Sequence, residues 1–113
     1  MKEPPVTTCS NPVIVEVPPP RLRVEQVEAL RRRLLGEVAA GHYHLVIDFA
    51  GVEFVDSSFL GLLVHVLKRV AASGGDVRLC NLTPSIQSIL SMTRLDVVFR
   101  AFDSRPDAVD SFS

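Results

Sequence analysis

The sequence predicts a single domain of the α/β class, and three observations favour it. Short β-branched or apolar runs alternate with longer stretches whose apolar residues recur every three or four positions, as in helices packed on a sheet. The chain has 113 residues, a length that suits one domain. Hydrophobic residues make up 47% of it and charged residues 22%, so an ordinary buried core is expected. We expect a flexible N-terminal segment over residues 1–12 and the domain over residues 13–113.

The first part of the domain is predicted to be a strand, a helix and a second strand. Residues 13–17 are mostly β-branched, and the proline triplet at 18–20 ends that strand. Apolar residues then recur at helical spacing over residues 24–38, and Gly41 ends this helix. Residues 45–49 are almost all apolar, as expected for a strand whose two faces are both covered by helices.

The remaining part of the chain continues the same alternation. Its predicted elements are, in order, a helix from Ser57 to a stop at residues 73–76, a strand over 77–82, a helix opened by Thr83 and Pro84, a strand over 97–102 and a helix over 105–112. The sum is four or five strands and about four helices. Right-handed crossovers would join those strands that are parallel neighbours.

The composition argues against nucleic acid and membranes as partners. The formal net charge is −1, so no overall field attracts polyanions. No apolar run reaches the roughly 20 residues of a spanning helix. The start has no apolar core of the signal-peptide type, so we expect a cytoplasmic protein without direct membrane insertion. Cys9 and Cys80 form no disulfide framework, and we expect Cys80 to be a buried free thiol.

The turn after residues 45–49 has a functional signature. Asp56, Ser57 and Ser58 stand where an N-cap is expected, directly before an apolar helical run. One interpretation is that Asp56 or a serine only caps the helix. The other is that hydroxyl groups near free backbone N–H groups and the positive end of the helix dipole suit an added negative charge, above all a phosphate. Local chemistry leaves both interpretations open.

A catalytic serine is a third interpretation of the same turn. The turn has the position of a nucleophile elbow but lacks the flanking glycines of that motif. His65 lies about 12 Å along the helix from Ser57, too far to activate it, and nothing places His42 or His44 at the turn. His42 and His44 also lack the Cys or carboxylate partners of a metal site. We therefore expect no enzyme, no metal and no cofactor, and keep a small serine hydrolase as the alternative to test.

The order of elements, together with this turn, resembles the STAS domain, specifically the stand-alone anti-sigma factor antagonists of bacteria. The resemblance covers about residues 13–112. Its most specific segment is residues 45–61, where a buried strand leads into Asp-Ser-Ser, then Phe, Leu and Gly. Supporting matches are residues 74–79 and the helix start at residues 83–86. The resemblance implies the STAS fold, with a mixed sheet of four to five strands packed with about four helices.

The resemblance implies a regulatory protein. Ser57, directly after the aspartate, is the implied phosphoacceptor, with Asp56 and Ser58 on the same switch surface. In this family, the unphosphorylated protein binds an ATP-dependent serine kinase that doubles as an anti-sigma factor, which releases the sigma factor. Phosphorylation ends the interaction, and a metal-dependent serine/threonine phosphatase restores it. The alternatives are a STAS-type accessory subunit docked on a transporter ATPase and a component of a larger multi-STAS assembly.

Three more residues complete the candidate site. Phe59 is either a core residue or an exposed anchor on the partner-binding surface. Gly61 is expected to be small because the helix start packs close to the sheet. Family members often carry Gly-x-Leu-Asp before the first helix, whereas here Arg23 takes the place of the aspartate. Arg23 is therefore either a charge-assisted partner for a phosphate on Ser57 or the sign of a changed kinase-facing surface.

Overall fold

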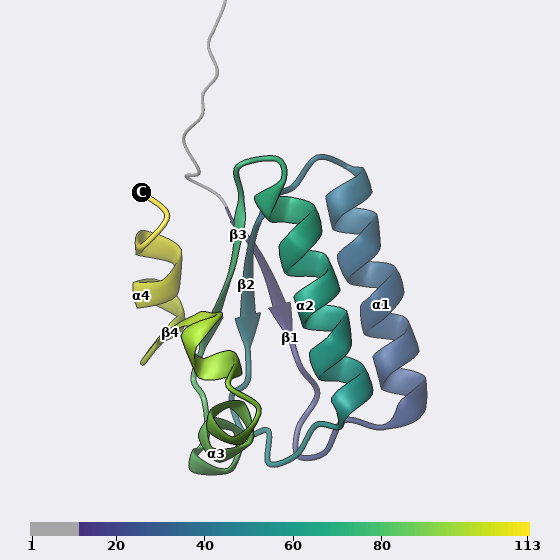
Figure 1. The fold of residues 1–113 in the computed structure, drawn as a ribbon, viewed down its shortest axis with the longest axis vertical. Coiled ribbons are helices and arrows are strands. Elements are labelled where there is room, and N and C mark those ends of the chain that lie inside the picture. Colours follow the sequence, from purple (N-terminus) through teal and green to yellow (C-terminus); the bar gives the residue numbers. More distant parts are fainter. Residues whose placement is uncertain (1–11) are drawn as a thin grey trace, which may run out of the picture.

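The fold is built on one parallel sheet with helices on both faces. A computed structural model describes residues 12–113 of the chain (Figure 1). The strands are β1 (Val13–Glu16), β2 (His44–Asp48), β3 (Asp76–Cys80) and β4 (Arg100–Phe102). The helices are α1 (Val24–Ala39), α2 (Ser57–Ala71), α3 (Pro84–Met92) and α4 (Arg105–Asp110), with a short 3-10 helix, η1 (Leu95–Val97), after α3. In this described part of the chain, no helix has the length and hydropathy needed to cross a membrane.

The strands lie in the sheet in sequence order, β1-β2-β3-β4. Of the predicted four or five strands, the described residues form four, and the prediction of about four helices is confirmed. Every pairing between these strands is parallel, so within residues 12–113 the sheet is not mixed as predicted. The reason is that each of the first three strands is followed by a helix that returns the chain to the same end of the sheet. Residues 1–11, which include most of the predicted flexible segment and Cys9, lie outside the described residues.

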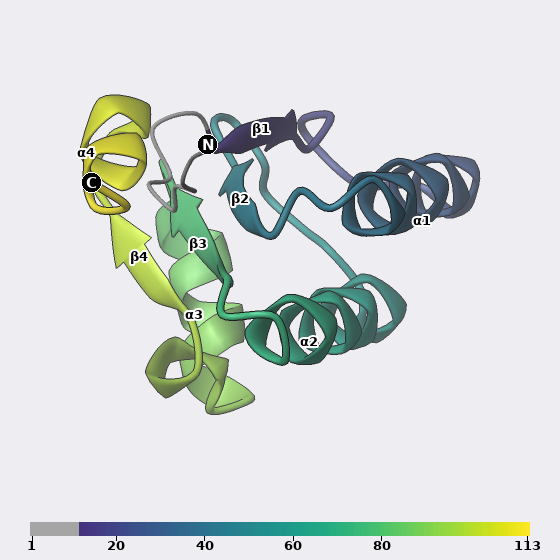
Figure 2. The same cartoon turned by 90° about the horizontal axis from the view of Figure 1, so that it is seen from above.

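Alternating strand residues build one apolar layer on each face of the sheet. Ile47 and Leu79, which pair across β2 and β3, are fully buried in the main core with residues of α1 and α2. On the opposite face, α4 covers Val46 and Cys80 through Ala108 (Figure 2). The prediction of a buried free thiol at Cys80 is confirmed, and burial raises the pKa of this thiol to about 11.

The strand predicted over residues 97–102 is wrong in its first half. Arg94 has a left-handed backbone (φ 65°), after which the chain forms η1, and the N–H of Phe99 donates to the Leu95 carbonyl (3.1 Å). The β-branched and aromatic residues here favour a strand locally, but the chain must turn from the end of α3 to the edge of the sheet, and tertiary geometry overrides propensity. The other predicted elements agree with the structure to within two residues at their ends.

Candidate functional site

The segment between β2 and α2 lies at the end of the sheet where α1, α2 and α3 all begin (Figure 1). It is held from two sides. The N–H of Glu53 donates to the Pro20 carbonyl (2.6 Å), and the hydroxyl of Thr83 donates to the Val52 carbonyl (2.6 Å). Thr83 also caps α3, as predicted. The first turn of α2 is therefore positioned by the segments that precede both α1 and α3.

Asp56 is the N-cap of α2, and its carboxylate organises the first turn of that helix. Its Oδ1 accepts hydrogen bonds from the N–H groups of Ser58 (3.1 Å) and Phe59 (3.2 Å) and from the Ser58 hydroxyl (2.6 Å). These bonds, with that from the Ser58 hydroxyl first among them, lower the pKa of Asp56. The carboxylate is therefore ionised near neutral pH and satisfies two of the N–H groups that a helix start leaves without partners.

The two serines of the turn are not equivalent. Ser58 is exposed, but its hydroxyl is engaged with Asp56. Ser57, the first residue of α2, is also exposed, and within residues 12–113 its hydroxyl has no hydrogen-bond partner. Since Asp56 already occupies the N–H groups of Ser58 and Phe59, an anion attached to Ser57 meets a carboxylate instead of those donors. Of the two hydroxyls, that of Ser57 is therefore the one left unengaged within residues 12–113.

No histidine stands beside Ser57 as a general base. His42 binds Glu37 (2.6 Å) near the end of α1, and His44 is the first residue of β2, so both lie at the opposite end of the sheet. His65 is exposed two turns further along α2. Among the residues that the structure describes, no three His, Cys, Asp or Glu side chains are grouped so that they could hold a metal ion. The geometry therefore offers no support for the serine hydrolase.

Two expectations about the start of α2 need correction. Phe59 is 1% exposed and its ring packs edge-on against Phe49, with centroids 6.2 Å apart, so it belongs to the core and not to the partner-binding surface. Gly61 is exposed, and a Cβ added there would meet no atom within 4 Å, so close packing on the sheet is not the reason for this glycine. Gly61 lies one helical turn after Ser57, and the exposed surface of α2 has no side chain at this position.

Arg23 is the N-cap of α1, and its side chain is exposed. Its guanidinium lies 3.8 Å from the Glu25 carboxylate, while its backbone N–H donates to Oε1 of Gln26 (2.8 Å). Arg23 makes no hydrogen bond to Ser57 in the described part of the chain. Pairing between Arg23 and a phosphate on Ser57 therefore remains a hypothesis. The structure does place the Arg23 turn beside the segment that leads to Ser57, because the N–H of Leu22 donates to the Phe54 carbonyl.

The sequence profile of the STAS domain family matches residues 3–108. This chain belongs to the STAS domain family. A STAS-domain anti-sigma-factor antagonist protein from Planctomyces limnophilus is 26% identical and superposes with a TM-score of 0.79 over 96% of each chain. The anti-sigma F factor antagonist of Paenibacillus polymyxa is 26% identical over 78% of this chain and 69% of its own length. The phosphorylated form of the Bacillus cell fate determinant SpoIIAA has a TM-score of 0.71 over 88% of this chain and 89% of its own, and at 20% identity this likeness shows the fold alone.

This STAS domain contains a buried ionic cluster that was not predicted from the sequence. Asp48, 4% exposed, accepts at Oδ1 from the N–H of Ala50 (2.9 Å) and the amide of Asn81 (3.0 Å), and at Oδ2 from Arg105 (2.8 and 3.0 Å). Arg105 also pairs with Glu16. Burial by itself would raise the pKa of Asp48. The hydrogen bonds from Asn81, Arg105 and Ala50 outweigh this effect, so the pKa lies below its usual value. The cluster joins α4 to the turn after β2, and its one sequence signal is an aspartate in an apolar strand.

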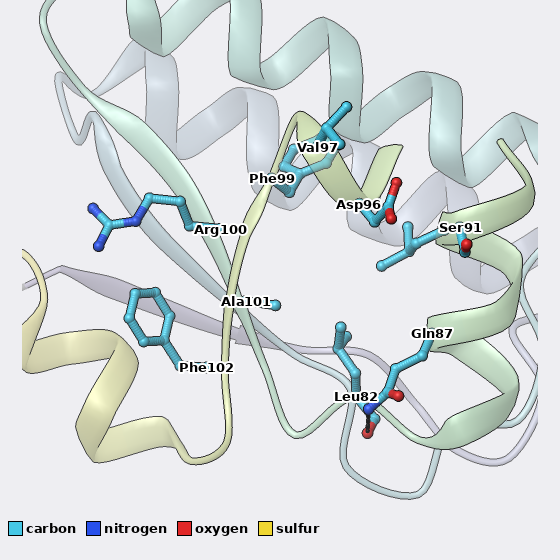
Figure 3. Close-up of a pocket in the computed structure, with 10 residues that line it drawn as sticks. Leu82, Gln87, Ser91, Asp96, Val97, Phe99, Arg100, Ala101 and Phe102 are labelled. Carbon is cyan, nitrogen blue, oxygen red and sulfur yellow. Dashed lines mark hydrogen bonds between the residues drawn. The ribbon is translucent and has the colours of Figure 1, made fainter. Parts of the chain in front are cut away.

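A groove of about 700 Å³ lies between α3 and β4 (Figure 3). Leu82, Phe99 and Ala101 line it. Arg100 also contributes to its lining, although its side chain extends to the other side of β4. None of its lining residues belongs to the segment from Asp56 to Gly61. Over residues 12–113 the strands follow sequence order, so this part of the sheet has no reversal of strand order of the kind at which open α/β sheets bind ligands.

Proposed function

We propose that this STAS domain is an anti-sigma factor antagonist that binds a serine-kinase anti-sigma factor and is switched off by phosphorylation at Ser57. The observation that carries the proposal is the difference between the two serines of the turn. Ser57 presents an exposed hydroxyl without a hydrogen-bond partner among residues 12–113, while the Ser58 hydroxyl is engaged with the Asp56 carboxylate. The names of relatives such as the Paenibacillus polymyxa antagonist support the same role.

In the proposed reaction this chain is the substrate. The Ser57 oxygen attacks the γ-phosphorus of an ATP held by the kinase, the bond from that phosphorus to the β,γ-bridging oxygen breaks, and ADP leaves. The kinase supplies the ATP and the base that takes the hydroxyl proton, since no histidine in the described residues is placed to do so. A serine/threonine phosphatase returns the hydroxyl by hydrolysis of the phosphoester.

Phosphorylation would act on the surface and leave the core in place. It adds about −1.5 to −2 charges at the first residue of α2, next to the ionised Asp56. The cap bonds of Asp56 do not use Ser57, so the helix start can persist while the two negative groups repel each other. A partner that docks over Ser57 would have to bury or pair this charge. We therefore expect lost binding without unfolding.

The test is binding to the serine-kinase anti-sigma factors of the source organism, each purified and measured by calorimetry with ADP present. We expect tight binding by the wild type, loss of binding by Ser57→Asp, and retained binding by the matched control Ser58→Ala. With ATP, phosphosite mapping by mass spectrometry is expected to find the phosphate on Ser57. Binding that survives Ser57→Asp together with phosphate found only on Ser58 would refute Ser57 as the switch. Failure to bind any of these kinases would refute the antagonist role.

A further inference from the structure

A second groove, of about 470 Å³, lies next to the Ser57 turn. It is lined by Pro20, Arg21, Leu22, Arg23 and Phe54. These residues come from two segments, the connection between β1 and α1 and the segment between β2 and α2. Both segments lie at the end of the sheet where α1 and α2 begin (Figure 1). The residues that line the groove therefore lie at this end as well.

The two walls of this groove are joined through the backbone. Arg21 and Phe54 form a parallel bridge, and the N–H of Leu22 donates to the Phe54 carbonyl (3.2 Å). Only Val55 and Asp56 separate Phe54 from the phosphoacceptor proposed above. A partner that covers the proposed phosphoacceptor therefore lies within reach of the groove.

The groove has an exposed apolar floor. Phe54 is 40% exposed, although its neighbours Val52 and Val55 are buried. The Arg21 guanidinium lies over the Phe54 ring, 4.8 Å from its centroid, which keeps a cation at the edge of this apolar surface. Exposed aromatic and arginine side chains together are typical of the anchors of protein interfaces.

Arg21 and Arg23 are the charged residues that line the groove, and both are exposed. Arg23 stands at a helix N-cap, where Ser, Thr, Asp or Asn is favoured and where the helix dipole disfavours a cation. Its ion pair with Glu25 is long, 3.8 Å, and both side chains are more than 70% exposed, so water screens it. Three carboxylates lie nearby in the chain: Glu25 faces Arg23, Glu53 accepts a hydrogen bond from the Ser85 hydroxyl, and Asp56 holds the first turn of α2. None of them lines the groove.

We propose that this groove docks a carboxylate-bearing segment of the kinase anti-sigma factor. An apolar side chain of that segment packs beside Phe54, and its carboxylates pair with Arg21 and Arg23. The proposal rests on the proposed function and deepens it, because it states the chemistry of the partner surface that recognises this chain. It also gives a reason for Arg23 at a position where helix stability favours an acceptor: the side chain serves an intermolecular contact.

The experiment is calorimetry on the kinase that binds the wild type, with the double variant Arg21→Glu/Arg23→Glu and, separately, Phe54→Ala. We expect the double charge reversal to weaken binding by about tenfold to a hundredfold, as charge-paired contacts do, with the larger effect at low salt. The matched control is Arg32→Glu/Arg69→Glu, which makes the same change in net charge at two exposed positions away from the groove. We expect it to bind within about twofold of the wild type. Circular dichroism should show that all variants remain folded.

Equal binding by the Arg21→Glu/Arg23→Glu variant and the wild type would overturn the docking proposal, and so would tighter binding, which would indicate a basic partner surface. If Ser57→Asp still abolishes binding in either case, the proposed function stands and only the docking chemistry is wrong. If the wild type binds none of the kinases, both proposals fail. A loss of affinity in Arg32→Glu/Arg69→Glu as large as in the groove variant would also overturn the docking proposal, because the effect would then come from net charge.

Discussion

Replacement of Phe59 by alanine tests whether this residue holds the start of α2 or serves as a partner anchor. Phe59 is 1% exposed and its ring packs edge-on against Phe49 at a centroid distance of 6.2 Å. Loss of a buried phenyl group costs its transfer free energy and leaves a cavity, together about 3–5 kcal/mol in well-packed cores. The lost aromatic pair contributes about 0.5–1.5 kcal/mol within that total. We expect Phe59→Ala to lower the free energy of unfolding by about 4 kcal/mol.

Urea denaturation followed by circular dichroism measures this change. A loss of about 4 kcal/mol is a large part of the roughly 5–15 kcal/mol that holds a domain of this size together. Phe59→Leu keeps most of the volume, and its expected loss is below about 1.5 kcal/mol. The exposed Phe54 is the matched aromatic control, and Phe54→Ala should stay within about 1 kcal/mol of the wild type. Unchanged stability in Phe59→Ala, with lost kinase binding, would refute the core assignment and restore the surface anchor.

Three further positions, Gly61, Gly75 and Asp48, are tested by urea denaturation for their contribution to the stability of the domain. Gly61→Ala should raise the free energy of unfolding by about 0.5–1 kcal/mol, because the position is helical and open; a decrease would show a contact that the structure lacks. Gly75→Ala should lower the free energy of unfolding by about 1–3 kcal/mol, since a Cβ there overlaps the Tyr43 carbonyl. The control is Gly36→Ala, at an open helical position, which should not lower the free energy of unfolding. Asp48 has a folded pKa below its unfolded value of about 3.9, so its stabilisation is present above pH 4 and is lost as the pH falls through the folded pKa. Asp48→Asn should therefore show a shallower loss of stability than the wild type as the pH falls below about 4, and an equally steep loss would contradict the assignment.

The α/β class, the order of the elements, the cap at Thr83 and a cap formed by Asp56 or a neighbouring serine were predictable because their signals are local. A cap involves residues within one turn of each other, and the apolar periodicity of a helix or strand is present in the sequence itself. The same local signals were misleading over residues 97–99, where β-branched and aromatic residues lie in a turn that only the path of the chain imposes. They also identified the Ser turn, but not which of its two hydroxyls is free.

Tertiary structure decided what no local signal contains. Asp48 and Arg105 meet across 57 positions of the chain, and their contact exists only because α4 folds onto the face of the sheet opposite α1 and α2. Phe59, the third residue of α2, points into the core because of the way this helix is rotated against the sheet, while Ser57 and Gly61 lie on its exposed side. The groove beside Phe54 exists because a bridge joins Arg21 to a segment more than 30 residues away. By itself, the sequence determined the fold class, the order of the elements and most of their approximate ends, because those signals are local. Packing of the elements against one another determined which side chains are available to a partner.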